Sequence, residues 1–274
     1  MSTTTQHSLW NGSAGRAWVE AQDLLDRMFE PFETLLVQAA VGASARRVLD
    51  IGCGTGATTL ALARALGEAA SCVGVDISAP MIELARRRAA AAGSGARFVC
   101  ADAQRHDVGQ QFDLLVSRFG VMFFDDPQRA FSRLHVAARP GAGLCCIAWR
   151  SAAENRFMTA AERAARPLLP QLPQRQADGP GQFSLDDDMR AKRMLEAAGW
   201  KAVRITPLDV RCSFPETKLI RYFTLLGPVG LALQNVDGPT RKRVVSTVRA
   251  AFEPFVEGNT VRFGAACWRI EAAA

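Results

Sequence analysis

The alternation of hydrophobic and polar residues changes along the chain and separates it into parts. Over residues 15–41, apolar side chains recur every three or four positions, which predicts an amphipathic helix that Pro31 is expected to kink or split. From residue 46 to 150, short apolar runs alternate with helical stretches. Strands and helices that alternate in this way form βαβ units, so this part predicts a parallel sheet covered on both faces. The predicted strands are 46–51, 71–76, 97–100, 112–117 and 143–149, and the predicted helices are 58–66, 80–92 and 126–138.

The pattern is different after residue 150. The predicted elements are helices over 152–165 and 186–198, a loop rich in proline and glycine over 166–183, strands over 202–212 and 259–271, and a mostly helical segment over 216–257. If the last two strands pair, the sheet ends in an antiparallel edge. The helical segment between them then forms an insertion over one end of the sheet, where a substrate lid would sit.

Composition and charge narrow the class of protein. The chain has 274 residues, of which 49% are hydrophobic and 22% charged, as in an ordinary globular protein. The formal net charge is +6, but the basic residues are scattered rather than gathered in a block. We therefore expect neither a nucleic-acid partner nor a membrane partner.

The cysteines and the N-terminal residues indicate the cellular compartment of the protein. The seven cysteines include no C-x-x-C pair and lie mostly in apolar stretches, so we interpret them as small buried residues in a reducing compartment. Residues 1–11 are polar and lack the apolar stretch of a signal peptide. The uncharged run over 222–236 is too short and too broken by glycine and proline to span a bilayer. These features predict a cytoplasmic protein.

The strongest local signal is the segment V-L-D-I-G-C-G-T-G-A over residues 48–57. A strand there enters a glycine-rich turn and then a helix, and the glycines allow a ligand to approach the backbone closely. The glycine spacing also fits the dinucleotide fingerprint, so the glycines alone are equally consistent with an NAD(P)-dependent oxidoreductase. Asp50, two residues before Gly52, would repel a pyrophosphate and favour a ligand that carries an ammonium or a sulfonium.

Acidic residues follow three successive strands. Asp50 and Asp76 lie at the ends of the first two strands, and Asp102 follows the third. The carboxyl ends of the strands are the edge at which open α/β sheets bind ligands, and an acid at the second strand is placed to bind ribose hydroxyls. Each aspartate could instead cap the helix that follows it, but that alternative does not account for all three beside a glycine loop.

In these residues the chain resembles the class I S-adenosylmethionine-dependent methyltransferases, and within them the small-molecule group that includes quinone-biosynthesis enzymes. The resemblance follows the order and spacing of motifs over residues 46–150, namely 48–59, 73–78, 98–103, 112–120 and 139–144. It implies a doubly wound, seven-stranded, mostly parallel Rossmann-like sheet with an antiparallel last strand and a helical insertion or lid. It also implies one domain over 1–274, with a helical cap at 1–45, a cofactor-binding core at 46–150 and a C-terminal part at 151–274 whose insertion spans about 213–258.

The resemblance further implies roles for residues in binding S-adenosylmethionine. Asp50 and the loop backbone would hold the methionine end, Asp76 the ribose hydroxyls and Asp102 the adenine amino group. Trp18 would close over the cofactor from the N-terminal helix. The residues implied for the cofactor are Trp18, Asp50, Gly52, Cys53, Gly54, Thr55, Asp76, Ile77, Met81, Asp102, Ala103 and Ser117.

The sequence says less about the methyl acceptor and the catalytic group than about the cofactor. Trp10, Phe119 and Tyr222 are candidates for contact with a small-molecule acceptor, whereas no catalytic base is assigned and no metal is expected. Asp126-Pro127 more simply begins a helix than binds a metal. The segment after residue 117 lacks the proline-rich and Pro-Cys motifs of the family's base-modifying enzymes, which favours a small molecule. The sequence is also consistent with a non-catalytic regulatory protein that binds S-adenosylmethionine. The apolar helices could form the interface of a homodimer.

Overall fold

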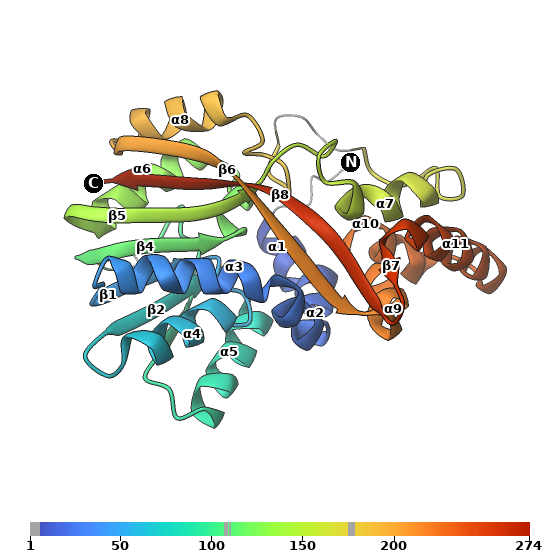
Figure 1. The fold of residues 1–274 in the computed structure, drawn as a ribbon, viewed down its shortest axis with the longest axis horizontal. Helices are drawn as coiled ribbons and strands as arrows, with labels where there is room; N and C mark the ends of the chain where they lie inside the picture. The colour runs from blue at the N-terminus through green and yellow to red at the C-terminus, as the bar shows by residue number, and fades with distance from the viewer. Residues whose placement is uncertain (1–5, 107–108, 110, 175–178) are drawn as a thin grey trace.

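A single eight-stranded sheet forms the centre of the structure, which is a computed structural model that describes residues 6–106, 109, 111–174 and 179–274. The strand order is β3-β2-β1-β4-β5-β8-β6, and β7 pairs with β8 off this path (Figure 1). The first five strands are parallel: β1 (Arg47–Ile51), β2 (Ser71–Asp76), β3 (Arg97–Cys100), β4 (Phe112–Arg118) and β5 (Ala138–Trp149). The order reverses at β1, where β2 and β4 lie on its two sides, and such a point is where open α/β sheets bind ligands.

The C-terminal strands close the sheet in the predicted antiparallel manner. β8 (Thr260–Ala273) lies between β5 and β6 (Lys201–Pro215) and runs antiparallel to both. Both strands are longer than predicted and continue past β5 as a two-stranded ribbon (Figure 1). The short β7 (Val256–Glu257), which the sequence pattern did not reveal, pairs with β8 near the end of this ribbon.

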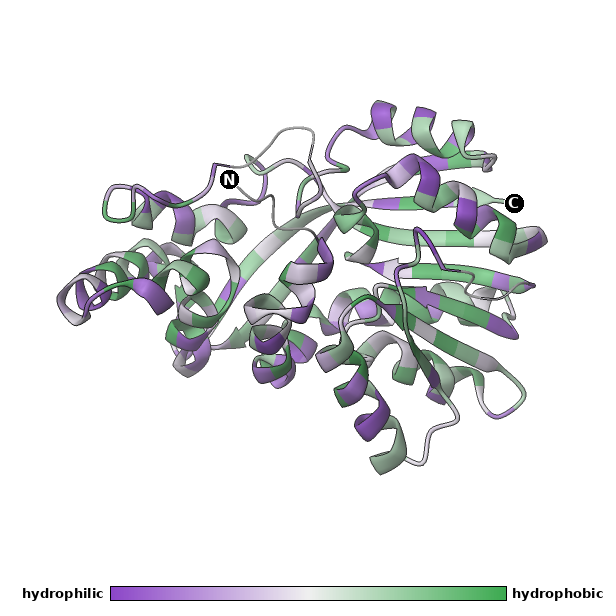
Figure 2. Cartoon of the chain, turned by 180° about the vertical axis from the view of Figure 1, so that it is seen from behind, coloured by the Kyte–Doolittle hydropathy of each residue, from purple (hydrophilic) through white to green (hydrophobic). Residues whose placement is uncertain are grey.

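Helices cover both faces of the sheet, as the alternating pattern predicts. α3 (Gln22–Gly42), α4 (Ala57–Leu66) and α5 (Ala79–Ala91) lie on the face toward the viewer in Figure 1. α6 (Pro127–Ala137) and α8 (Asp188–Ala197) cover the other face, where α8 packs on α6 and β6. Seen from behind and coloured by hydropathy, the strands are mostly hydrophobic, whereas the helices carry hydrophilic residues on their outer sides (Figure 2).

The N-terminal part is helical, but its breaks differ from the prediction. It forms α1 (Gln6–Asn11), α2 (Ser13–Glu20) and α3. The predicted split at Pro31 is wrong, because α3 continues through that residue; the helices are separated instead at Ala21, between α2 and α3. Met28, Phe32, Leu36 and Ala40 are fully buried along the continuous helix α3.

The predicted helical insertion lies between β6 and β8 at the far end of their ribbon. It contains α9 (Leu219–Leu225), α10 (Gly227–Ala232) and α11 (Gly238–Ala251), and α11 packs on α7 (Arg156–Ala165). Short 3-10 turns add the remaining helical residues at 120–123, 216–218, 233–235 and 253–255. Aromatic side chains hold this part together, with Phe157 stacked on Phe263 at 3.8 Å between ring centroids. Among the described residues, no helix is both long enough and apolar enough to cross a bilayer.

Candidate functional site

A glycine loop joins the carboxyl end of β1 to α4. Gly52, Gly54 and Gly56 have positive φ angles of 67°, 54° and 88°, a left-handed conformation that side chains rarely adopt. The backbone N–H groups of Gly52 and Cys53 donate to the carbonyl oxygen of Val75, at 2.8 and 3.1 Å. The loop is therefore held against the end of β2, the neighbouring strand.

The loop also lies directly against the end of β4. A Cβ atom on Gly52 would lie 2.6 Å from the Cα atom of Gly120, and one on Gly120 would lie 2.5 Å from the carbonyl oxygen of Ile51. The Ser117 hydroxyl donates to that oxygen at 2.7 Å and accepts from the N–H of Gly120 at 3.1 Å. Ser117 is fully buried and lines neither of the two cavities described below; its hydroxyl fixes the two strand ends to each other.

Asp76 connects the glycine loop to the end of β2. Its Oδ2 accepts from the N–H of Gly54 at 2.8 Å, and its Oδ1 accepts from the N–H of Ser78 at 2.9 Å. Burial raises the pKa of Asp76, and these backbone donors partly oppose the shift. Each carboxylate oxygen has more than one lone-pair site, so the side chain retains acceptor capacity toward the cavity that it lines.

Asp50 is buried beneath the same loop. Its side chain is 1% exposed, and its Oδ2 accepts from the Thr59 hydroxyl at 2.6 Å. Burial raises the pKa of Asp50 from 3.8 to about 6, and the nearby Asp76 carboxylate adds to the increase. A cation placed beside Asp50 would stabilise the ionised form, so this position favours a positively charged ligand group.

Asp102 lies at the end of the third strand, as predicted, and is bound by its own loop. Its Oδ1 accepts from the backbone N–H of Gln104 at 2.9 Å and from the side-chain amide of Gln104 at 3.2 Å. The Gln104 amide oxygen in turn accepts from the N–H of Asp126 at 2.8 Å, which ties this loop to the start of α6. Gln104 was not identified in the sequence, because its role depends on a contact 22 residues away.

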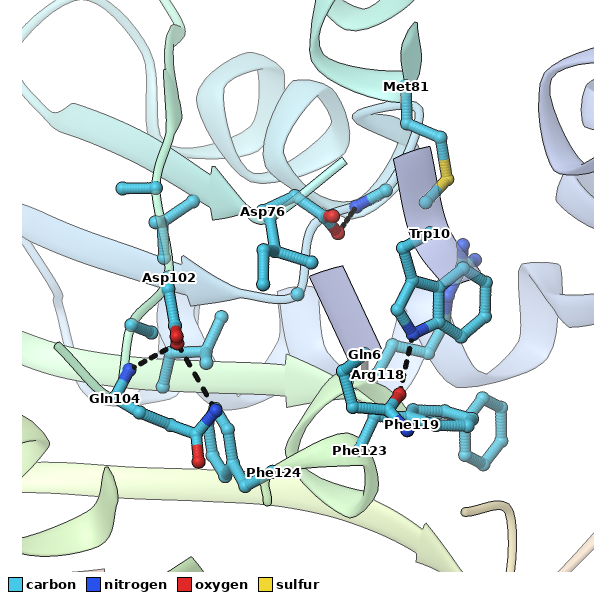
Figure 3. A pocket seen from close by; sticks show the side chains of 18 of the residues that line it. Gln6, Trp10, Asp76, Met81, Asp102, Gln104, Arg118, Phe119, Phe123 and Phe124 are labelled. Atoms are coloured by element: carbon cyan, nitrogen blue, oxygen red, sulfur yellow. Dashed lines mark hydrogen bonds between the residues drawn. The ribbon is translucent and has the colours of Figure 1, made fainter. Parts of the chain in front are cut away.

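These elements border a cavity of about 730 Å³, part of which is open to solvent. Asp76 and Asp102 reach it from the sheet, while Gln6 and Trp10 face them from α1 (Figure 3). The residues that line it are Gln6, Trp10, Trp18, Ile51, Gly52, Gly54, Val75, Asp76, Ile77, Met81, Ala101, Asp102, Ala103, Gln104, Arg118, Phe119, Gly120, Phe123 and Phe124. We call it the first cavity; its polar acceptors and apolar walls suit a nucleoside.

A second cavity adjoins the first on the side of α3. It is lined by Trp18, Leu25, Asp26, Phe29, Asp50, Gly52, Cys53, Gly54, Thr55, Thr58, Arg118 and Phe119. The two cavities share Trp18, Gly52, Gly54, Arg118 and Phe119, so they meet above the glycine loop. Each cavity carries three charged side chains, whereas the aromatic residues Trp10, Phe123 and Phe124 line only the first.

Helix α1 is fixed over the first cavity by hydrogen bonds to the loop after β2. The Asn11 side chain donates to the carbonyl oxygen of Ile77 at 3.0 Å and accepts from the N–H of Ala79 at 2.9 Å. The Ser78 hydroxyl donates to the carbonyl oxygen of Trp10 at 2.7 Å. The Trp10 ring meets the edges of Trp18 and Phe123, which completes an aromatic wall. The role of Asn11 was not predicted from the sequence, because its partners lie 66 to 68 residues away.

The structure brings most of the predicted site residues together. Those that line one or both cavities are Trp10, Trp18, Asp50, Gly52, Cys53, Gly54, Thr55, Asp76, Ile77, Met81, Asp102, Ala103 and Phe119. Tyr222 is placed elsewhere, because its ring packs among Phe157, Phe214 and Phe252 and its hydroxyl faces the sulfur of Met158 at 3.7 Å. It therefore belongs to the aromatic core of the insertion.

Neither a reactive thiol nor a metal cluster is found among the described residues of the site. Cys53 lines the second cavity, but burial and the carboxylates of Asp76 and Asp50 raise the pKa of its thiol well above the usual range. No group of three or more histidine, cysteine or acidic side chains in the described parts of the chain is placed to hold a metal. Six of the seven cysteines are buried as predicted, whereas Cys100 is exposed.

Comparison with known proteins agrees with this geometry. Residues 48–141 match a family model described as a methyltransferase domain. Over 132 residues the chain is 34% identical to a demethylmenaquinone methyltransferase of Thermus thermophilus, a match that covers 46% of this chain and 59% of the relative. Over 134 residues it is 31% identical to the aklanonic acid methyltransferase DauC of a Streptomyces species, covering 47% and 61%. The matches thus span little more than half the length of these curated relatives.

Solved structures show the same fold over a greater length. The chain aligns with the crystal structure of the YcgJ protein from Bacillus subtilis with a TM-score of 0.57, covering 88% of this chain and 97% of the other. The sequence identity is 17%, so this likeness concerns the fold. A structure described as a methyltransferase from Bacillus halodurans aligns with a TM-score of 0.53 at 16% identity, covering 86% and 97%.

We predict that Gly120→Ala destabilises the protein by about 1–3 kcal/mol, because the added methyl group overlaps the backbone at the end of β1. Urea unfolding measures the change. Gly264→Ala is the matched control, since a Cβ there has no neighbour within 4 Å and its φ is not left-handed, and it should stay within about 0.5 kcal/mol of the parent. Equal stability of the two variants would contradict the close approach of β1 and β4.

Proposed function

We propose that this chain, whose residues 48–141 match the methyltransferase domain model, transfers the methyl group of S-adenosylmethionine to a small-molecule acceptor and releases S-adenosylhomocysteine. The observation that carries the proposal is the meeting of three strand-end aspartates around one pair of joined cavities. Asp76 and Asp102 border the first cavity and Asp50 the second. This arrangement fits a ligand with a nucleoside at one end and a cationic amino acid at the other.

The residues of the first cavity suit the nucleoside part. Asp76 is placed to accept from the ribose hydroxyls, and Asp102 to accept from the adenine amino group. Ile77 and Met81 supply apolar surface beside them. In the second cavity, Asp50 suits the ammonium group, and the glycine loop allows the ligand to approach its backbone.

The chain's contribution to the reaction is positioning. Bound S-adenosylmethionine supplies an electrophilic methyl group that leaves its sulfur as an acceptor nucleophile attacks in line. None of the described residues that line either cavity is a histidine, lysine or tyrosine. The aspartates there are assigned to the cofactor or paired with Arg88, so we assign no general base. Orientation of two reactants can supply roughly 7–11 kcal/mol of a barrier.

Aromatic walls indicate the kind of acceptor. Trp10, Phe119, Phe123 and Phe124 border the first cavity beside the nucleoside-binding residues. Flat aromatic or quinone-like molecules stack well on such surfaces, and the two methyltransferases matched above are named for acceptors of this kind. We place the activity in the cytoplasm, because seven free cysteines suit a reducing compartment.

Calorimetric titration tests the cofactor directly. The purified protein should bind S-adenosylmethionine and S-adenosylhomocysteine at micromolar concentration and should not bind NADH. Binding of NADH without the other two would support the oxidoreductase alternative. Binding of S-adenosylmethionine, with no methyl transfer to any of a panel of quinols, phenols and amines, would instead favour a regulatory protein.

Asp76→Ala should weaken the binding of S-adenosylhomocysteine by about tenfold or more, because it removes charge-assisted hydrogen bonds to the ribose. Glu83→Ala is the control, since the Glu83 side chain is 72% exposed on α5 and lines neither cavity. Thermal unfolding should show that both variants are folded. Undiminished affinity in a folded Asp76→Ala protein would rule out the assigned role.

The affinity for S-adenosylmethionine should fall on acidification. The pKa of Asp50 is about 6, so at pH 5 roughly nine in ten molecules carry a protonated Asp50, and binding that needs its charge weakens by about tenfold. The folded pKa exceeds the ordinary 3.8, so protonation of Asp50 does not itself unfold the protein; it favours the folded state. Titrations between pH 7.5 and 5 measure the effect. Asp50→Asn should bind weakly throughout, and an unchanged pH dependence in that variant would assign the effect to another group.

A further inference from the structure

Arg118, the last residue of β4, presents an unused charged donor to the site. Its Nη1 atom is buried and has no hydrogen-bond partner among the described residues. The guanidinium carbon lies 5.8 Å from the centre of the Phe29 ring on α3, and that ring covers part of the charged group. A buried charged donor without a partner costs free energy, so its retention at a cavity wall points to a ligand group that completes it.

The charges around Arg118 show what kind of group would fit. Asp26, which also lines the second cavity, is already paired with Arg88 at 2.5 Å, and Arg88 also donates to the carbonyl oxygen of Thr55 at 2.7 Å. Asp50 has a neutral partner, the Thr59 hydroxyl. The second cavity thus carries one carboxylate and one guanidinium that are not neutralised by a direct ion pair.

The electrostatic surroundings place Arg118 on the side of Asp50. Its positive charge lowers the pKa of both Asp50 and Glu33 of α3, against the larger effect of burial. Because Arg118 also lines the first cavity, its side chain stands where the two cavities join. A zwitterion fits between such walls, with its cationic group toward Asp50 and its anionic group toward the guanidinium.

We propose that Arg118 binds the α-carboxylate of S-adenosylmethionine, opposite Asp50, and thereby selects ligands that retain the complete amino-acid end. The inference rests on the proposed function and adds to it a residue that recognises charge. A planar guanidinium can bind a carboxylate through two parallel hydrogen bonds, which a lysine ammonium cannot do. The protein should therefore discriminate against a ligand that keeps the nucleoside, the sulfur and the amine but lacks the carboxylate.

The test compares two ligands on four proteins by calorimetry. The ligands are S-adenosylhomocysteine and its decarboxylated analogue, which retains the amine. The proteins are the parent chain, Arg118→Gln, Arg118→Lys and Arg87→Gln, the last a matched control whose exposed arginine pairs with Glu83 on the outer side of α5. Thermal unfolding establishes that each variant is folded.

We expect the parent to bind S-adenosylhomocysteine about tenfold to a hundredfold more tightly than the analogue, as for the loss of hydrogen bonds to a charged group. Arg118→Gln should lose this preference by weakening the binding of S-adenosylhomocysteine while leaving that of the analogue nearly unchanged. Arg118→Lys should retain part of the preference, and Arg87→Gln should match the parent.

The outcomes separate this inference from the proposed function. If the parent binds neither ligand, the proposed function is wrong. If Arg118→Gln retains the full preference and its affinity for S-adenosylhomocysteine, Arg118 does not bind the carboxylate, although the cofactor assignment stands. In that case, a rise in KM for an anionic acceptor in Arg118→Gln would assign the guanidinium to the acceptor instead. Equal weakening of both ligands in a folded Arg118→Gln protein would also overturn the inference.

Discussion

The close approach of two backbone segments underlies the whole site. Gly52 and Gly120 lie so near each other that neither position has room for a side chain, and the Ser117 hydroxyl holds the two segments together. This contact sets the glycine loop against the end of β4. Because Asp50 precedes the loop and Arg118 precedes Gly120, the same contact places their opposite charges at one cavity. A backbone constraint thereby fixes the electrostatics of the site.

How far the sequence predicts the structure depends on how local each cause is. The strands at 71–76 and 97–100 were predicted to the residue. β2 is buried on both faces and therefore leaves a continuous apolar run, whereas β3 is an edge strand in which only Phe98 is buried. The reversed C-terminal edge was predicted from the order of elements, and the structure confirms it. The split predicted at Pro31 was wrong, because it considered only the tendency of proline to interrupt a helix. α3 also packs on α4, β4 and β6, and it continues through Pro31. The short α1 carries too little periodicity to be recognised.

The site residues also fall into those that the sequence predicts and those that it does not. The strand-end aspartates and glycines were found because a parallel sheet brings its carboxyl edges together, so position along the chain predicts proximity. Asn11 and Gln104 were missed because their function lies in hydrogen bonds to distant backbone groups, which leave no pattern in a single sequence. Tyr222 was chosen for its chemistry as the single tyrosine, but the insertion folds around it and buries it against Phe157. A polar tip on an aromatic side chain does not show whether the ring faces a ligand or a core.

The two joined cavities together suit one long ligand. Catalysis by orientation requires that such a ligand be held at both ends. The first cavity can hold a nucleoside through Asp76 and Asp102, and the second can hold an amino acid through Asp50 and Arg118. The reactive sulfur of such a ligand would then lie between them, where Phe119 and Gly52 border both cavities. The hydrogen bonds of Asn11 and Ser78 keep α1 against the first cavity, while Trp18 of α2 borders the junction of the two cavities.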